Sequence, residues 1–187
     1  MRQYDVVMSA PYCCVAASLE SILKRHGINN ISQYDIANEF GIVALGSERD
    51  ELPPELTNVT YTDDVRQVGM HLTNDSLNNF FVKHKLPFQE TYIGWKSISE
   101  LNIESMLQAV SEDYDVIFFF DFGDLFCEDK NRGVGHSSVF ISIDENYIVT
   151  HLNLGPRFLG QNKHASEEMA HAIRSRAGGI SIISPKS

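Results

Sequence analysis

The sequence lacks any long apolar run, and one sign of charge is in short supply. Nowhere are about 18 consecutive residues apolar, the length that spans a bilayer, and residues 1–9 contain no apolar signal core. Lys and Arg number 15 against 25 Asp and Glu, which gives a formal net charge of −10. An acidic chain is a poor partner for nucleic acid or for an anionic membrane. We therefore expect a cytoplasmic protein that binds neither nucleic acid nor a membrane.

Cysteine is also scarce, with one adjacent pair, Cys13 and Cys14, and a distant third residue, Cys127. Three cysteines do not make the disulfide framework of a small secreted protein. A reduced chain is the simpler expectation, although Cys127 could pair with either of the others. The adjacent pair lacks the two-residue gap of a zinc knuckle, and no His-x-x-x-His sequence lies near it. The sequence therefore predicts no metal site and no cofactor.

What the chain does contain is an ordinary globular composition, with 43% hydrophobic and 21% charged residues over 187 positions. That length suits one domain with a substantial core. Helical apolar spacing comes first along the chain and strand-like runs follow, an order typical of the α+β class. We predict a single domain over residues 1–187, with a helical half at about 1–112 and a mostly antiparallel sheet at about 113–187.

The expected elements follow from apolar spacing and turn residues. Helices are expected at residues 14–25, between Ser32 and Gly41, around 77–82, at 103–110 and at 167–176. Strands are expected at residues 88–93, 116–120, 137–143, 147–152 and 179–184. Residues 45–64 are rich in Gly, Pro, Ser, Asp and Thr, which is typical of a long surface loop.

The stretch from Tyr12 to Leu23 is the first that could carry chemistry. Apolar residues recur within it at the spacing of one helical face. A cysteine in the first turn of such a helix meets unpaired backbone N–H groups and the positive end of the helix dipole, which both favour thiolate over thiol. The alternative is that Cys13 and Cys14 are small buried apolar residues, as most free cysteines are.

A thiol nucleophile needs a base, and the base needs a group that orients it. Among seven histidines, His136 follows a Gly-Val-Gly sequence and begins a predicted strand, a position held by a sheet yet open to a cleft. The next strand ends with His151 and Asn153, which share one face. In an antiparallel hairpin the start of one strand lies beside the end of the next. We therefore expect His136 to lie near His151 and Asn153.

This order of residues resembles that of papain-like cysteine peptidases: an early cysteine opening a buried helix, a late histidine on a strand, and Asn or Asp one hairpin later. The chain is most similar to the bacterial peptidases that process bacteriocin leaders at a double glycine, and to their stand-alone relatives. Their helix reads Cys-Gly-x-Ala-x-(Ile/Leu)-x-x-(Ile/Leu)-Leu, with a Gly thirteen residues after the cysteine. Taking Cys14 as the nucleophile places Gly27 at that position, whereas Cys13 shifts the apolar positions by one.

The resemblance implies a catalytic site of Cys14, His136 and Asn153, with Cys13 and His151 as the alternatives. The family's His-x-Val-Val-Φ strand is similar to the five residues that start at His136, and its Asp-Pro pair, absent here, would fall near residue 152. Asn153 suits the orienting role best, because its side chain can accept a hydrogen bond from the imidazole N–H, as Asn does in papain-like enzymes.

The chain departs from the family at the oxyanion hole. Six residues before the cysteine, the family has a Gln that donates to the oxyanion, and Met8 stands there in this chain. Gln3 is too far along the chain to replace it, whereas Ser9 or the backbone N–H of the cysteine could do so in part. Losing one such donor costs on the order of 3 kcal/mol of transition-state stabilisation.

The implied function is that of a thiol hydrolase, a cysteine peptidase or amidase that forms an acyl-enzyme with a peptide or acyl substrate. No metal or cofactor is needed for this reaction. Three alternatives stay open: a papain-like acyltransferase in a biosynthetic pathway, a non-catalytic module that binds a peptide or protein, and an α+β domain with incidental cysteines. The sequence identifies neither the substrate nor the oligomeric state.

Overall fold

The computed structural model describes residues 2–73 and 75–186, and within them no helix has the length and apolar character needed to cross a membrane. The helices are α1 (Cys14–Arg25), α2 (Gln33–Phe40), α3 (Ser76–Lys83), α4 (Glu100–Ala109), the short α5 (Phe122–Leu125) and α6 (Ser166–Ser175). The strands are β1 (Ile42–Leu45), β2 (Val59–Thr62), β3 (Phe88–Gly94), β4 (Asp115–Asp121), β5 (Gly135–Ile143), β6 (Ile148–Asn153), β7 (Gly160–Ala165) and β8 (Gly179–Pro185).

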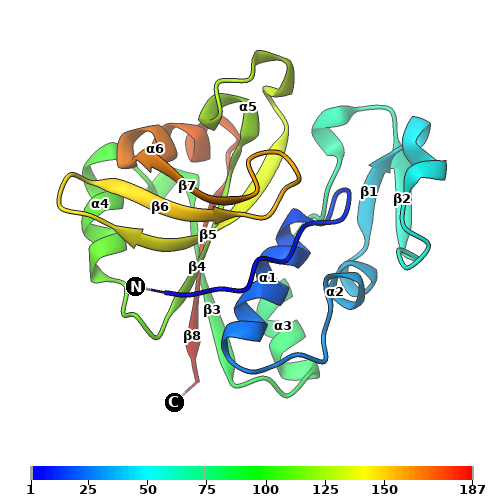
Figure 1. Cartoon of the computed structure of the whole chain (residues 1–187), viewed down its shortest axis with the longest axis horizontal. Helices are drawn as coiled ribbons and strands as arrows, with labels where there is room; N and C mark the ends of the chain where they lie inside the picture. Colours follow the sequence, from blue (N-terminus) through cyan, green and yellow to red (C-terminus); the bar gives the residue numbers. More distant parts are fainter. Residues whose placement is uncertain (1, 74, 187) are drawn as a thin grey trace.

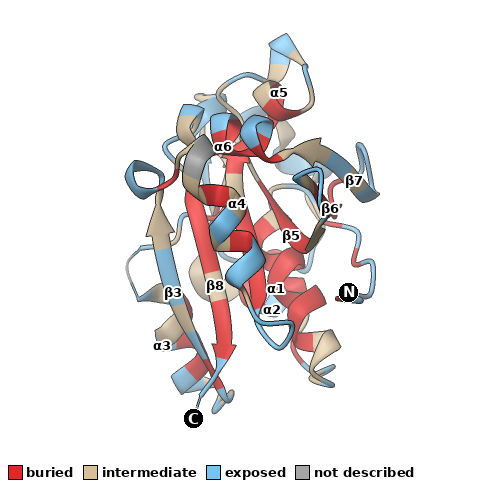
Figure 2. Ribbon diagram, turned by 90° about the vertical axis from the view of Figure 1, so that its left-hand side faces the viewer, coloured by how far each residue is buried: buried red, intermediate tan, exposed pale blue. Residues whose placement is uncertain are grey.

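Six strands form one antiparallel sheet in the order β3-β8-β4-β5-β6-β7, and β1 and β2 form a separate parallel pair. Helix α1 lies against one face of the large sheet, and α4 and α6 cover the other (Figure 1). Figure 2 shows that β8, inside the sheet, is mostly buried, whereas the edge strands β3 and β7 carry exposed residues. The predicted α+β class is therefore confirmed.

Alternate side chains of the large sheet serve two hydrophobic cores. In β4, Ile117 belongs to the core under α1 together with Val139 of β5, whereas Phe118 and Phe120 belong to the core under α4 and α6. Successive side chains of a strand point to opposite faces, so a strand covered on both sides must be apolar throughout. This is why residues 116–120 form an uninterrupted apolar run.

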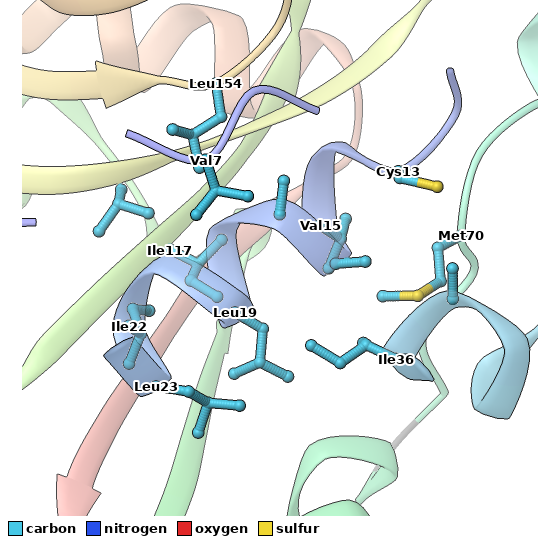
Figure 3. Packing of buried hydrophobic residues seen from close by; sticks show 14 of the residues in the cluster. Val7, Cys13, Val15, Leu19, Ile22, Leu23, Ile36, Met70, Ile117 and Leu154 are labelled. Carbon is cyan, nitrogen blue, oxygen red and sulfur yellow. The ribbon is translucent and has the colours of Figure 1, made fainter. Parts of the chain in front are cut away.

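Helix α1 forms over the residues that the sequence predicts, Cys14–Arg25. Its apolar side chains, Leu19 among them, are completely buried and lie beside Ile36 of α2 and Ile117 of β4 (Figure 3). Gly27 follows the helix with a φ of 76°, the left-handed conformation that favours glycine at this position. Packing on both sides fixes α1, and so fixes the position of its first residue, Cys14.

The far end of α1 is tied to the sheet through Asp115, which is completely buried. The Asp115 carboxylate accepts a hydrogen bond from the Tyr4 hydroxyl at 2.6 Å and pairs with the Arg25 guanidinium, and the His26 Nε2 atom lies 2.7 Å from it. One carboxylate therefore connects the N-terminal segment, the last turn of α1 and the start of β4. Buried charges of this kind are stable when each has such partners.

Two parts of the chain were predicted wrongly. Residues 45–64 are not one long loop, because they contain a 3-10 helix (Gly46–Glu51) and β2. None of the four residues of β2 is buried, so this strand lacks the apolar alternation by which sequence patterns are recognised. Strand β7 was not expected either, since it is a polar edge strand defined by its backbone pairing with β6.

Replacing Leu19 by Ala should lower the free energy of unfolding by about 2–5 kcal/mol, because a cavity would remain inside the core under α1. Urea unfolding of both proteins measures this difference. The matched control is Val82→Ala on α3, where the side chain is 63% exposed and the expected change is below about 0.5 kcal/mol. Similar losses for the two variants would show that burial of α1 does not govern stability.

Candidate active site

The turn before α1 sets the direction of the Cys14 side chain. Cys14 is the first residue of α1 and Cys13 is its N-cap. Tyr12 has a φ of 65°, a conformation uncommon for residues other than glycine. Its hydroxyl bonds to the Glu48 carboxylate, and the Leu45 backbone N–H donates to that hydroxyl at 3.4 Å. The segment after β1 therefore holds the turn from which the cysteine projects.

Cys14, His136 and Asn153 meet where α1 adjoins β5 and β6. His136 is the second residue of β5, and the antiparallel register places Asn153, the last residue of β6, opposite Ser138. His136 Nε2 lies 2.7 Å from Asn153 Oδ1. The other ring nitrogen, Nδ1, is thus left for the Cys14 thiol, whose pKa responds both to the imidazole and to Ser137. The structure brings together the three residues that the sequence analysis preferred.

The contact between Cys14 and His136 shifts both pKa values in the direction of an ion pair. Burial raises the pKa of the Cys14 thiol, but the hydrogen bond and charge of His136, with hydrogen bonds from Ser137, outweigh burial and hold this pKa below its usual value. Burial lowers the pKa of His136, and the Cys14 thiolate together with the bond to Asn153 raises it above its usual value. Both shifts act toward a protonated imidazole and a nucleophilic thiolate.

The Asn153 side chain is completely buried, and its neighbours fix which way its amide points. Its Nδ2 donates to the carbonyl of Arg157 at 2.9 Å, and its Oδ1 accepts from the backbone N–H of Gly155 at 3.0 Å. With the amide held in this way, Oδ1 is the atom that faces His136, so Nε2 of the imidazole acts as the donor. The ring nitrogen toward Cys14 is then free to exchange a proton with sulfur.

Aromatic rings and a glycine confine the imidazole further. Phe120 and Phe122 contact the His136 ring edge to face, with centroids 5.6 Å and 5.1 Å away. A β-carbon on Gly155 would lie 3.1 Å from His136 Cε1, tighter than ordinary van der Waals contact. Sequence reasoning had identified none of these three neighbours, because two of them lie on β4 and α5 and only the fold brings them to His136.

Cys13, the alternative nucleophile, lies inside the core under α1. It is completely buried, and burial together with the nearby Cys14 thiol raises the pKa of Cys13 to about 12. A thiol in this state is protonated at neutral pH and does not act as a nucleophile. The geometry therefore favours Cys14 over Cys13.

His151, the alternative orienting residue, bonds to His164 and not to His136. Its Nε2 lies 2.9 Å from Nδ1 of His164, and the ring of Phe120 contacts both His151 and His136. Burial, with smaller effects from His164 and His136, lowers the pKa of His151 to about 3. His151 is therefore a neutral buried residue, and Asn153 alone of the two bonds to His136.

The structure leaves few side-chain donors for an oxyanion. Met8 is 60% exposed. The side-chain amide of the nearby Gln33 already donates to the Met8 backbone carbonyl at 3.0 Å. Gln3 is exposed and lines a separate surface hollow with Lys24. The Ser9 hydroxyl donates to the Ala10 carbonyl at 2.8 Å. The backbone N–H of Cys14, in the first turn of α1, has no partner within the helix and is the remaining donor of those expected.

A cleft of about 130 Å³ adjoins Cys14 and His136. Its far wall is the segment that contains Gly69 and His71, and Arg176 lines the cleft from the end of α6. No pattern in the sequence marks Arg176, because its position depends on the packing of α6 against the sheet. Among the described residues, no three His, Cys, Asp or Glu side chains are placed to hold a metal ion.

The helices and the antiparallel sheet have the arrangement of the papain-like fold. Among solved structures, the chain is similar to a crystal structure described as a candidate C39-like peptidase from Bacillus anthracis, with a TM-score of 0.59 and 13% identity over 100% of both chains. Likeness at this identity concerns the fold. No family model and no curated protein matches the sequence. The papain-like fold that the sequence resemblance implied is therefore confirmed.

At about pH 6, Cys14 in the folded protein should react with iodoacetamide faster than it does in the urea-unfolded chain. Its pKa in the folded state lies below the usual value, so thiolate persists as the pH falls and is lost only below that lowered pKa. His136→Ala should slow the reaction about tenfold for each unit that the pKa rises.

Mass spectrometry of the labelled peptide measures these rates. Cys13→Ala is the matched control, because it removes the neighbouring thiol and should leave the pH profile of Cys14 unchanged. Equally slow labelling of Cys13 and Cys14 in the folded protein would contradict the ion pair.

Proposed function

We propose that this chain is a cysteine peptidase or amidase of the same kind as the double-glycine leader peptidases of bacteria and their stand-alone relatives. The observation that supports this most is the 2.7 Å bond from His136 Nε2 to Asn153 Oδ1. This bond directs the second ring nitrogen to Cys14, which is the arrangement that activates a thiol for attack on an acyl carbon. A cytoplasmic location and a peptide or acyl substrate belong to the same proposal.

In the proposed reaction the Cys14 thiolate attacks the carbonyl carbon of a peptide or amide bond and forms a C–S bond. The tetrahedral oxyanion then collapses, the C–N bond breaks, and the His136 imidazolium gives its proton to the leaving amine. Neutral His136 next removes a proton from a water molecule as that water attacks the thioester. The carboxylic acid leaves, and its release restores the thiolate and the imidazolium. Asn153 keeps the ring oriented through both steps.

The oxyanion is expected to rely on the backbone N–H of Cys14, since Met8 stands where the family has a donating Gln. The missing side-chain donor lowers the rate by about 100-fold or more relative to a peptidase that retains it. We therefore expect this chain to cleave its substrate slowly. The proposal also leaves room for acyl transfer, in which an amine instead of water attacks the same acyl-enzyme.

The missing side-chain donor for the oxyanion favours a second candidate function, that of a non-catalytic module that binds a peptide. Met8 is exposed and carries no donor, and none of the other expected side chains replaces it. A binding module needs the cleft and has no need of an oxyanion hole. The retained contact between Cys14 and His136 counts against this candidate, because binding alone does not need a thiolate.

Cleavage of a pool of peptides of diverse sequence, followed by mass spectrometry, should show products with the wild-type chain and none with Cys14→Ala. Asn153→Ala should slow cleavage about tenfold or more, because the imidazole loses the partner that orients it. The matched control is Asn29→Ala, whose side chain is exposed and donates to the Gly27 carbonyl, and it should cleave at the wild-type rate.

Repeating the reaction with an added primary amine distinguishes hydrolysis from acyl transfer, since transfer gives the amide of the added amine. Peptide binding by both the wild-type chain and Cys14→Ala, with no cleavage by either, would support the binding module and would contradict the proposed enzyme.

A further inference from the structure

The cleft beside Cys14 adjoins a larger hollow of about 460 Å³. The two share four lining residues, Met70, His71, Phe119 and Arg176, and we treat the adjoining hollows together as one groove that starts at Cys14. This groove has room for the part of a substrate that extends beyond the bond under attack. The charged residues along it therefore bear on which substrates fit.

Arg176 lies where the cleft meets the larger hollow, directly after α6. A β-carbon on Gly135, the residue before His136, would lie 2.8 Å from Arg176 Nε. Glycine at this position thus lets the guanidinium rest on the strand that carries the imidazole. Arg176 Nη2 donates to the carbonyl of Arg66 at 2.8 Å, which fixes the guanidinium at the wall of the groove.

The Arg176 guanidinium has no carboxylate partner among the described residues. By contrast, Arg66 pairs with Asp64 at 3.1 Å and Arg157 pairs with Glu128 at 2.6 Å. A guanidinium has five N–H donors, and the Arg66 carbonyl uses one of those on Arg176. The others suit a carboxylate, which guanidinium binds with two parallel hydrogen bonds. In a chain with a net charge of −10, an unpaired cation that lines a groove is a feature for binding an anion.

The far end of the groove has the opposite charge. Asp75 and Glu90 line the larger hollow there, and the Glu90 carboxylate accepts a hydrogen bond from the Ser181 hydroxyl. These carboxylates disfavour an anion deep in the groove. Any anionic group of the substrate is therefore expected at the Arg176 end, close to the atoms that react.

We propose that Arg176 binds a carboxylate of the substrate beside the bond that Cys14 attacks, either an acidic side chain or a terminal carboxylate. This inference rests on the proposed function, because it takes Cys14 as the nucleophile. It makes Arg176 a residue that determines specificity and leaves the chemical steps to Cys14, His136 and Asn153.

Two small reagents test the anion site without knowledge of the substrate. Iodoacetate and iodoacetamide alkylate the same sulfur and are similar in size, and one carries a carboxylate where the other carries a neutral amide. Mass spectrometry gives the rate of each reagent at Cys14, with the exposed Cys127 of the same molecule as the internal reference. The measured quantity is the iodoacetate-to-iodoacetamide rate ratio at Cys14 relative to that at Cys127.

Arg176→Gln should lower this ratio about threefold or more, and Arg176→Lys, which keeps the charge, should lower it less. The matched control is Arg66→Gln, which also removes one positive charge but keeps the backbone carbonyl, and whose side chain is 71% exposed. This control should leave the ratio nearly unchanged. The positive charge of His136 also attracts iodoacetate, but it is present in all three variants and cancels in the comparison.

An unchanged ratio in Arg176→Gln, with Cys14 still more reactive than Cys127, would overturn the anion site and leave the proposed function standing. A wild-type Cys14 that reacts no faster than Cys127 with either reagent would contradict the proposed function, and the inference with it. If Arg176→Gln does not fold, the wild-type protein still decides. Propionate should protect Cys14 from iodoacetamide better than propionamide does, and equal protection would overturn the anion site.

Discussion

The contact between Cys14 and His136 is the interaction on which the rest of the site depends. Each group changes the pKa of the other, and it does so only while α1 stays in contact with β5. Burial works against both charges, so the shifts toward an ion pair depend on the closeness of the two groups. The hydroxyls of Ser18 and Ser137, 3.2 Å apart, lie at the same contact between the helix and the sheet.

Two separate parts of the fold position the two residues that make this contact. Packing of α1 between the large sheet and α2 positions the sulfur, and the pairing of β5 with β6 positions the imidazole and Asn153. The cleft lies beside both Cys14 and His136, and Arg176, directly after α6, lines it as well. Under the proposed function, residues such as Arg176 adapt the site to a substrate while the pair of Cys14 and His136 stays the same.

The local parts of this picture could be predicted from the sequence. Helical spacing located α1, and the resemblance to the leader peptidases favoured Cys14 over Cys13. The geometry of a hairpin placed the region of His151 and Asn153 beside His136 before the fold was known. The non-local parts could not be predicted. Gly155 reaches the site through the turn after β6, and Arg176 reaches it through the packing of α6. No periodic pattern in the sequence marks either residue. The polar strands β2 and β7 were missed for a related reason, since backbone pairing defines them.

The most direct test of the ion pair is an NMR titration of the His136 imidazole in the wild-type chain and in Cys14→Ala. In the wild-type chain the pKa should lie above the ordinary value of 6.5, because the thiolate and Asn153 stabilise the imidazolium. In Cys14→Ala the thiolate is gone and burial still disfavours the charge, so the pKa of His136 should fall. The same His136 pKa in both proteins would show that no proton is shared between sulfur and imidazole, and would contradict the account.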